Sequence, residues 1–529
     1  MRKKLSIILP AFIFSLNILI GISFRDYGNF IYLIGSGWNV LRSMILVTFY
    51  TVIFSFVLKK LYVRAECIIF KSEDRLSSRF VTTSSFFILL FCYSWFLGVY
   101  YPGSINSDSL DQVAQFFGLN ELTNHHPVLS SVLMGTCVKI GMLAGNGAIG
   151  MFLYTVLQTC VLAFAFAYTL GLMNKWGLPV RFIMMTLIFY GIMPFWGGYA
   201  QLMIKDTLYT AVVVLFVSQF LDILLESKRV PVSKKRMLLL ALTGILTALL
   251  RNNGIYVVIP CLIGGLFLCR KRPGRLVWVM GLGICIVAYT LWGSVLLPMA
   301  GVKEGSIREM LSIPFQQTAR YIGVYSEEVT DEEREAINAV LDYERIKSGY
   351  VPYGADPVKN TYKEPENELD ALANYFKYWL LMFTKHPMVY FEATVANSYC
   401  YYCTNNISTV EPLYVNFIYT NEHSSYLGLT EAGNNEHGKM VFDRYNSRFQ
   451  ELPIIKWLFS EGFYTYLLIG MLGFLVYIGK TACISGLLPN MIGVLVCIAS
   501  PILGSFRYFL PVIACTFISL AYCIKCKEE

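Results

Sequence analysis

LSIILPAFIFSLNILIGIS, at residues 5–23, is a long apolar run close to the start of the chain. An α-helix rises about 1.5 Å per residue, so a run of this length can cross a hydrocarbon core about 30 Å thick. Arg2, Lys3 and Lys4 precede it, as in a signal sequence, but no small-x-small cleavage site ends the run. We therefore expect residues 5–23 to form an uncleaved first membrane span.

Similar runs recur along the whole chain of 529 residues, of which 56% are hydrophobic and 15% are charged. Soluble globular proteins contain about 45–50% apolar and about 25% charged residues, so the bilayer is the main solvent here. We predict an all-α polytopic membrane protein with about twelve transmembrane helices. The expected spans lie at residues 5–23, 38–58, 81–99, 147–171, 182–199, 207–225, 237–250, 254–269, 276–298, 462–479, 485–503 and 506–524.

Loops rich in lysine and arginine orient the chain across the membrane. The net charge of +8 comes from basic residues in short loops between apolar runs, so it indicates topology and excludes a nucleic-acid-binding face. The basic loops 59–79, 175–181, 228–236 and 270–275 all fall on the side of the N-terminus if residues 127–143 are not a span. We therefore place 127–143 along the outer membrane surface as an interfacial helix, with both chain termini in the cytoplasm.

This topology divides the chain into three parts. Residues 1–298 form an N-terminal transmembrane core that includes an external motif loop at 100–146. Residues 299–461 have no apolar run long enough to span and combine charges, tyrosines and turn residues. They are expected to form an external mixed domain between the ninth and tenth spans. Residues 462–529 form the C-terminal transmembrane helices.

The external motif loop holds the densest polar sequence near the membrane, SINSDSLDQVAQFFGLNELTNHHP at residues 104–127. At a membrane edge, Asp108 could act as general base on a hydroxyl, a role worth about 10²–10⁴ in rate. Asp108 could equally cap the helix expected to begin nearby. His125 and His126 could bind a metal, but adjacent helical residues point apart and no third ligand is evident.

Three further motifs place polar residues at the outer ends of spans. They are Lys205 and Asp206 in QLMIKDTLYT, Arg251 and Asn252 in LLRNNGIY, and Arg507 and Tyr508 in SFRYFLP. Arginine presents a planar fork of donors that fits phosphate, so two arginines on one membrane face indicate an anion site. Each arginine alone could instead be an interfacial anchor, and the adjacent Lys-Asp pair a local ion pair at a helix start.

Two of these sequences resemble a known class of enzymes. The loop YPGSINSDSLDQ and the helix NHHPVLSSVLMGTCVKIG resemble the GT-C class of membrane glycosyltransferases, in which an external loop after an early span carries an acidic catalytic residue. KDT, RNNGIY and FRYFLP resemble motifs of an uncharacterised bacterial family within that class. The resemblance implies that Asp108 is the catalytic residue. Because the loop lacks an Asp-Glu pair, Asp111 remains an alternative and a divalent metal remains possible.

The resemblance also implies the reaction and its partners. A sugar on a polyprenyl-phosphate donor would pass with inversion to an envelope glycan or lipid acceptor, outside the plasma membrane of a bacterium. Membrane lipids are then partners, and no cofactor is required. The residues expected to bind substrate are His125, His126, Lys205, Asp206, Arg251, Asn252, Arg507 and Tyr508.

Two other functions remain open from the sequence. One is a transporter or flippase of lipid-linked glycans, and the other is a ligase or polymerase that joins whole glycan chains. A transporter should place ionisable groups near the bilayer midplane, within its spans. The predicted spans hold few such groups, which favours chemistry at the outer surface.

Overall fold

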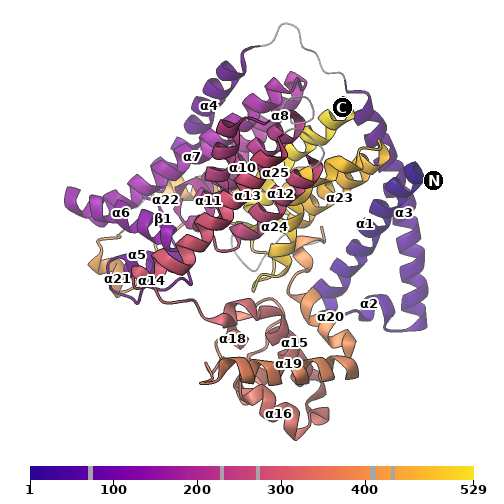
Figure 1. Ribbon diagram of the computed structural model, residues 1–529. Coiled ribbons are helices and arrows are strands. Elements are labelled where there is room, and N and C mark those ends of the chain that lie inside the picture. The colour runs from indigo at the N-terminus through magenta and orange to yellow at the C-terminus, as the bar shows by residue number, and fades with distance from the viewer. Residues whose placement is uncertain (69–75, 227–231, 270–273, 405–412, 431–434, 529) are drawn as a thin grey trace.

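The computed structural model describes residues 1–68, 76–226, 232–269, 274–404, 413–430 and 435–528 of the chain (Figure 1). These residues are predominantly helical, which confirms the predicted all-α class. The strands among them are β1 (Ser104–Ile105) and β2 (Leu202–Met203), which pair in parallel. In Figure 1 a broad helical body lies above a smaller lobe, and both chain termini lie in the upper half.

Eight helices in the described part of the chain are long and apolar enough to cross a membrane. They are α1 (Arg2–Tyr27), α3 (Gly37–Glu66), α4 (Ser78–Val99), α7 (Gly147–Lys175), α10 (Lys205–Glu226), α13 (Arg275–Leu291) continued by α14 (Leu297–Met299), α24 (Leu488–Ile498) with the turn before it, and α25 (Phe506–Lys525). Shorter helices occupy other predicted spans: α11 (Lys234–Leu250), α12 (Gly254–Leu268) and α23 (Glu461–Tyr477). The chain therefore has the features of a multi-pass membrane protein, and the total of twelve spans stays a prediction.

The span predicted at residues 182–199 is not a single helix. The structure divides it into α8 (Val180–Ile192) and α9 (Pro194–Gln201), which meet at an angle of 49°. The break falls at Met193, where ψ is 122°. The following proline explains it, because proline has no N–H to donate and disfavours helical geometry at the residue before it.

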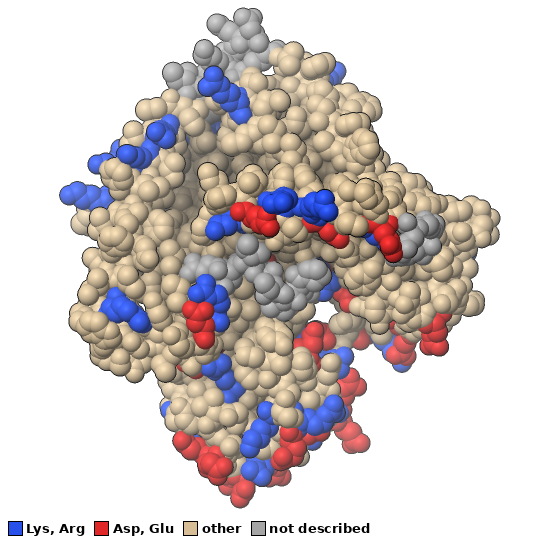
Figure 2. Space-filling view, turned by 180° about the vertical axis from the view of Figure 1, so that it is seen from behind, with Lys and Arg blue, Asp and Glu red and all other residues tan. Residues whose placement is uncertain are grey.

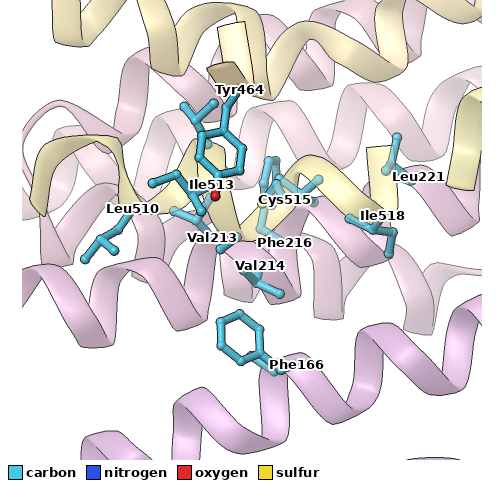
Figure 3. Packing of buried hydrophobic residues seen from close by; sticks show 14 of the residues in the cluster. Phe166, Val213, Val214, Phe216, Leu221, Tyr464, Leu510, Ile513, Cys515 and Ile518 are labelled. Carbon is cyan, nitrogen blue, oxygen red and sulfur yellow. The ribbon is translucent and has the colours of Figure 1, made fainter. Parts of the chain in front are cut away.

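Helix α10 forms the centre of the body. It is buried along almost its whole length and packs against α7, α11 and α25. Figure 3 shows Phe166 of α7, Phe216 of α10 and Ile513 of α25 among the buried side chains that join these helices. Tyr190 of α8 stacks on Phe166 with ring centroids 3.9 Å apart, and its hydroxyl donates to Ala514 O. Ring stacking and this buried hydrogen bond thus join α8 to α7 and α25.

Residues 127–143 form α6 (Val128–Ala144), an apolar helix of 17 residues. It packs against α7 and against α5 (Ser107–Phe116). Glycines permit the contact with α7, because a Cβ on Gly150 would lie 2.2 Å from Cys137 O and one on Gly141 would lie 2.0 Å from Gly150 N. The placement of α6 along the outer membrane surface stays a prediction.

The lobe has a hydrophobic core of its own, built from buried residues between Leu311 and Tyr390. Its helices are α15 (Ser312–Tyr325), α16 (Asp331–Asn338), α17 (Tyr343–Gly349), α18 (Asp356–Lys359), α19 (Glu368–Lys385) and α20 (Pro387–Ala396). The described part of 299–461 is therefore helical with isolated bridges, in place of the expected mixed structure. From Leu413 the chain packs against the body again, with α21 (Glu422–Tyr426) beside α5 and α22 (Glu436–Glu451) beside α9.

Charged side chains are distributed unevenly along the long axis of the molecule. In Figure 2 the upper part of one face shows Lys and Arg without Asp or Glu, whereas the lobe at the bottom carries both signs. The orientation is predicted from the basic loops, and several of their residues lie outside the described part of the chain: Lys71, Arg75, Lys228, Arg229, Arg270, Lys271 and Arg272. The cytoplasmic position of the two termini stays a prediction.

Candidate functional site

A short parallel strand pair brings the motif loop to the start of α10. β1 and β2 pair in the register Ser104 to Leu202. Helix α5 begins at Ser107, just after β1, and α10 begins at Lys205, just after β2. The pairing therefore sets the first turn of α5 beside the first turn of α10, although the two are far apart in the sequence.

Asn106, and not Asp108, caps α5. The side-chain Oδ1 of Asn106 accepts a hydrogen bond from Ser109 N over 3.0 Å. The alternative that Asp108 is the helix cap is therefore wrong, and its carboxylate contacts α25 instead. Arg507 Nη1 donates to Asp108 Oδ2 over 2.8 Å, with 34% of the Asp108 side chain exposed and 15% of that of Arg507.

Positive charge keeps the Asp108 carboxyl ionised. Burial by itself raises the pKa of Asp108, but the charges of Arg507 and Lys205 and the hydrogen bond from Arg507 together lower it to about 2. Asp108 is therefore a carboxylate at neutral pH. It is also a weak base for as long as Arg507 holds it.

His126 lies between Lys205 and Asp111. Lys205 Nζ is 3.1 Å from His126 Nδ1, and because an ammonium group only donates, Nδ1 accepts and the ring proton is on Nε2. Nε2 in turn lies 3.9 Å from Asp111 Oδ2. Burial lowers the pKa of His126 to about 3, and the charge of Lys205 contributes, so the ring is neutral at neutral pH.

Asp111 differs from Asp108 in its partners. Gln115 Nε2 donates to Asp111 Oδ2 over 2.9 Å, and Asn120 Nδ2 donates to Asp111 Oδ1 over 2.5 Å. His423 Nε2 lies 3.1 Å from Asn120 Oδ1, which links this network to α21. Neutral amides thus occupy both oxygens of Asp111, whereas cationic side chains surround Asp108. The two carboxylates that the sequence left as alternatives therefore have different electrostatic surroundings.

The two arginines singled out by the sequence share one aromatic ring. The guanidinium of Arg251 lies 4.3 Å from the centre of the Tyr508 ring, and that of Arg507 lies 4.9 Å from it. Arg251 also pairs with the buried Asp206, Nη1 to Oδ1 over 2.9 Å. With the adjacent Lys205, three cationic side chains from α10, the α11–α12 turn and α25 form one cluster.

Asn252 and His125 lie at the edge of this cluster. Asn252 Nδ2 donates to Asn124 O over 3.0 Å, which ties the turn between α11 and α12 to the motif loop. His125 faces Glu309, with Nδ1 4.0 Å from Glu309 Oε1, and 45% of its side chain is exposed. Asn252 therefore helps to assemble the site, and His125 faces the segment that leads to the lobe.

A narrow apolar cavity, which the sequence does not predict, extends from Arg251 and Tyr508 into the body. Side chains of α10, α12, α24 and α25 line it, among them Val213, Val257 and Pro511. In the sequence of its own helix, each of these residues cannot be told apart from the other apolar residues of a membrane span. A cavity built by four separate helices therefore has no local sequence signal.

The polar groups nearest to Asp108 suit an anion better than a cation. Lysine and arginine donate to phosphate and carboxylate oxygens, whereas metal ions need carboxylate, imidazole or thiolate ligands together. Within the described residues no group of three or more His, Cys, Asp or Glu side chains could hold a metal ion. The arrangement can bind a phosphate and keep a carboxylate beside it.

Comparisons with the curated proteins and with the solved structures find no match to this chain. A family of unknown function, DUF6020, matches residues 119–529. The matched part contains Lys205, Arg251 and Arg507, while Asp108 and Asp111 precede it. Because the match covers well over half of the chain, the protein belongs to the family of unknown function DUF6020.

Proposed function

We propose that this protein is an integral membrane glycosyltransferase that moves a sugar from a polyprenyl-phosphate donor to an envelope glycan or lipid acceptor. One observation carries the proposal: the Asp108 carboxylate pairs with Arg507, which belongs to a cluster of three cationic side chains with Lys205 and Arg251. A carboxylate can accept the proton of an acceptor hydroxyl, and clustered cations can hold a phosphate leaving group. Both are needed to transfer a glycosyl group.

In the proposed reaction the acceptor oxygen forms a bond to the anomeric carbon while the bond from that carbon to the phosphate oxygen breaks. The acceptor proton goes to Asp108, and the polyprenyl phosphate leaves with the electron pair, held by Arg251 and Arg507. The configuration at the anomeric carbon inverts. Charge is thereby stabilised where it develops, on the leaving phosphate.

Donor binding also prepares the base. A phosphate that binds Arg507 shares the guanidinium with Asp108 and adds negative charge beside the carboxylate. Both effects would raise the pKa of Asp108 above about 2. Asp108 then becomes a stronger base only when the donor is bound, so it would not take up a proton when no sugar can be transferred.

The apolar cavity supports a lipid-linked donor. It starts at Arg251 and Tyr508 and is lined by apolar side chains of spans, so the first units of a prenyl chain would enter it while the phosphate stays at the arginines. A soluble nucleotide sugar would have no use for such a lining. The other partners in this proposal are membrane lipids, and nucleic acid has no role.

The proposal includes twelve spans, a bacterial plasma membrane and an outer position for the lobe and the site. Both termini lie in the half of the molecule away from the lobe, so they would be cytoplasmic if the lobe is outside (Figure 1). Basic residues without acidic ones on the upper part of one face agree with this orientation (Figure 2).

A transporter or flippase is less well supported. The central helix α10 contains no charged residue between Asp206 and Asp222, so its middle offers no ionisable group to a passing solute. A ligase or polymerase would use the same donor chemistry, and product size separates it from a single-sugar transferase. No cofactor is required by the proposed steps, and a divalent metal could still assist the leaving phosphate.

The proposal is tested by comparing cell-envelope glycans and lipids, by mass spectrometry, in wild-type cells and in a strain lacking this protein. Loss of one sugar residue from a glycan or lipid, restored by the wild-type gene, would support single-sugar transfer. Loss of whole chains would point to the ligase. Loss of a glycan together with lipid-linked sugars accumulating on the inner side would replace the proposal with a flippase, and unchanged glycans and lipids would contradict the proposal.

A further inference from the structure

Arg507 follows a non-helical connection that joins α24 to α25. Helix α24 ends at Ile498 and α25 begins at Phe506, so the connection consists of residues 499–505. Gly504 in this connection has a φ of 61°, which is accessible to glycine at little cost. The backbone path of this connection fixes where α25 begins and hence where the Arg507 guanidinium stands.

The lobe pairs with this connection in the manner of a strand. Ala355 N donates to Pro501 O over 2.7 Å, and Leu503 N donates to Tyr353 O over 3.0 Å. An antiparallel bridge lies between these two bonds. These main-chain hydrogen bonds hold the backbone of the connection to the lobe, and they do not involve the Arg507 side chain.

Tyr401 holds the same connection through its hydroxyl group. The hydroxyl donates to Ile502 O over 2.8 Å, accepts from Ser505 N over 2.9 Å and lies 3.2 Å from Ser500 Oγ. Tyr401 is fully buried, and its ring stacks on Phe509 with centroids 5.8 Å apart. One hydroxyl thus binds both ends of the stretch that precedes Arg507.

Asn397 adds a further bond from the end of the lobe. It follows the last residue of α20, and its Nδ2 donates to Ser500 O over 2.8 Å while the residue is almost fully buried. Tyr401 lies one turn further along the chain, in the 3₁₀ turn Tyr399–Tyr401. The lobe is therefore continuous, through α20, with the groups that hold the connection before Arg507.

We infer that Tyr401 is a positioning residue, which acts through residues 500–505 to hold Arg507 where the phosphate of a lipid-linked substrate binds. The inference rests on the phosphate-binding role proposed above for Arg507. A phosphate could displace Asp108 from the guanidinium, and after that exchange the backbone of residues 500–505 would still fix the start of α25, which carries Arg507.

The test uses the full-length protein in detergent micelles and two ligands, a polyprenyl phosphate and the phosphate-free polyprenol of the same chain length. We expect Tyr401→Phe to lower the affinity for the lipid phosphate about tenfold. This is the loss that results if Arg507 is in its binding-competent position about a tenth as often as in the wild type. Affinity for the polyprenol should not change, because the apolar cavity is untouched. If Tyr401 had only a structural role, Tyr401→Phe would lower the affinity for both ligands equally.

Tyr190→Phe is the matched control. Tyr190 is also fully buried and also donates to the backbone of α25, at Ala514, but it lies away from the connection. We expect this variant to bind both ligands as the wild type does. Hydrogen–deuterium exchange of residues 499–505 should rise in Tyr401→Phe and not in Tyr190→Phe. If Tyr401→Phe does not fold, Asn397→Ala tests the same connection and should show the same phosphate-specific loss.

The outcomes separate the two proposals. If the wild-type protein binds the phosphate and the polyprenol equally, the phosphate site is wrong and the inference is lost with it. If the wild type prefers the phosphate and both Tyr401→Phe and Asn397→Ala keep that preference, the positioning role is wrong and the proposed function stands. An equal loss in Tyr190→Phe would also overturn the positioning role, because it would indicate general loosening of α25.

Discussion

Asp108 and Arg507 lie 399 residues apart in the sequence, yet their side chains meet over 2.8 Å. One belongs to the first turn of α5 and the other to the first turn of α25. The carboxylate occupies guanidinium donors that also suit a phosphate. In the proposed reaction a phosphate-bearing substrate would compete with Asp108 for Arg507, and this one contact would couple substrate binding to the base strength of Asp108.

Replacing Asp108 should abolish transfer without unfolding the protein. Asp108→Asn keeps the shape and removes the basic carboxylate, so we expect the rate to fall by about 10²–10⁴. The measurement is the amount of modified envelope glycan in a deletion strain that carries each variant, with protein in the membrane quantified in parallel. Asp111→Asn is the control and should keep most activity, because neutral amides already occupy both oxygens. Equal losses in the two variants would contradict the assignment of Asp108 as the base.

The arginines should not tolerate lysine. A guanidinium can hold two phosphate oxygens at once, whereas an ammonium is a single point of charge. Loss of one charged hydrogen bond, worth about 1.5–3 kcal/mol, predicts roughly ten- to hundredfold weaker binding of a polyprenyl phosphate in Arg507→Lys and in Arg251→Lys. Arg444→Lys, on the exposed side of α22, should bind normally. Normal binding by Arg251→Lys and Arg507→Lys would instead identify both as interfacial anchors.

Stability should fall in mild acid because of His126. Its pKa is lowered from 6.5 to about 3 in the folded protein, so between these values the unfolded chain binds a proton that the folded chain does not. Folded-state stability therefore decreases as the pH falls from about 6.5 toward 3. Thermal unfolding in detergent between pH 4.5 and 7.5 should show a weaker pH dependence in His126→Gln than in the wild type. His437→Gln, at an exposed position, serves as the control; identical pH profiles for wild type and His126→Gln would count against a buried neutral ring.

The contact between α6 and α7 should depend on Gly150. A Cβ at this position would lie 2.2 Å from Cys137 O, so Gly150→Ala should destabilise the protein by about 1–3 kcal/mol. Gly283→Ala, in α13, meets nothing within 4 Å and should be neutral or stabilising. Unfolding midpoints of the two variants in the same detergent provide the comparison. A stable Gly150→Ala protein would mean that α6 can move away from α7.

The proposed orientation can be tested with membrane-impermeant thiol reagents on intact cells. In a background without reactive native cysteines, Glu327→Cys on the lobe should be labelled and Lys234→Cys at the start of α11 should not. Both residues are exposed, so burial does not explain a difference between them. The reverse pattern would place the lobe and the candidate site in the cytoplasm.

The helical class of this protein follows from its sequence alone. Long apolar runs must satisfy their own backbone hydrogen bonds in a bilayer, and a helix does so within one segment. The same pattern placed Lys205, Arg251 and Arg507 at the ends of predicted spans and Asp108 in the loop after the third span. These features are local, because each depends on residues close together in the chain.

The tertiary structure decided which of those ends meet. The pairing of β1 with β2 brings α5 to α10, and the packing of α25 on α10 adds Arg507 to the same place. It also gave Asp108 and Asp111 different hydrogen-bond partners, although their sequence surroundings are similar. The apolar cavity, too, forms only where four helices pack together. The physical reason is that packing between helices far apart in the sequence depends on the shapes of many side chains together. The sequence of one apolar run does not show which other helices it will contact.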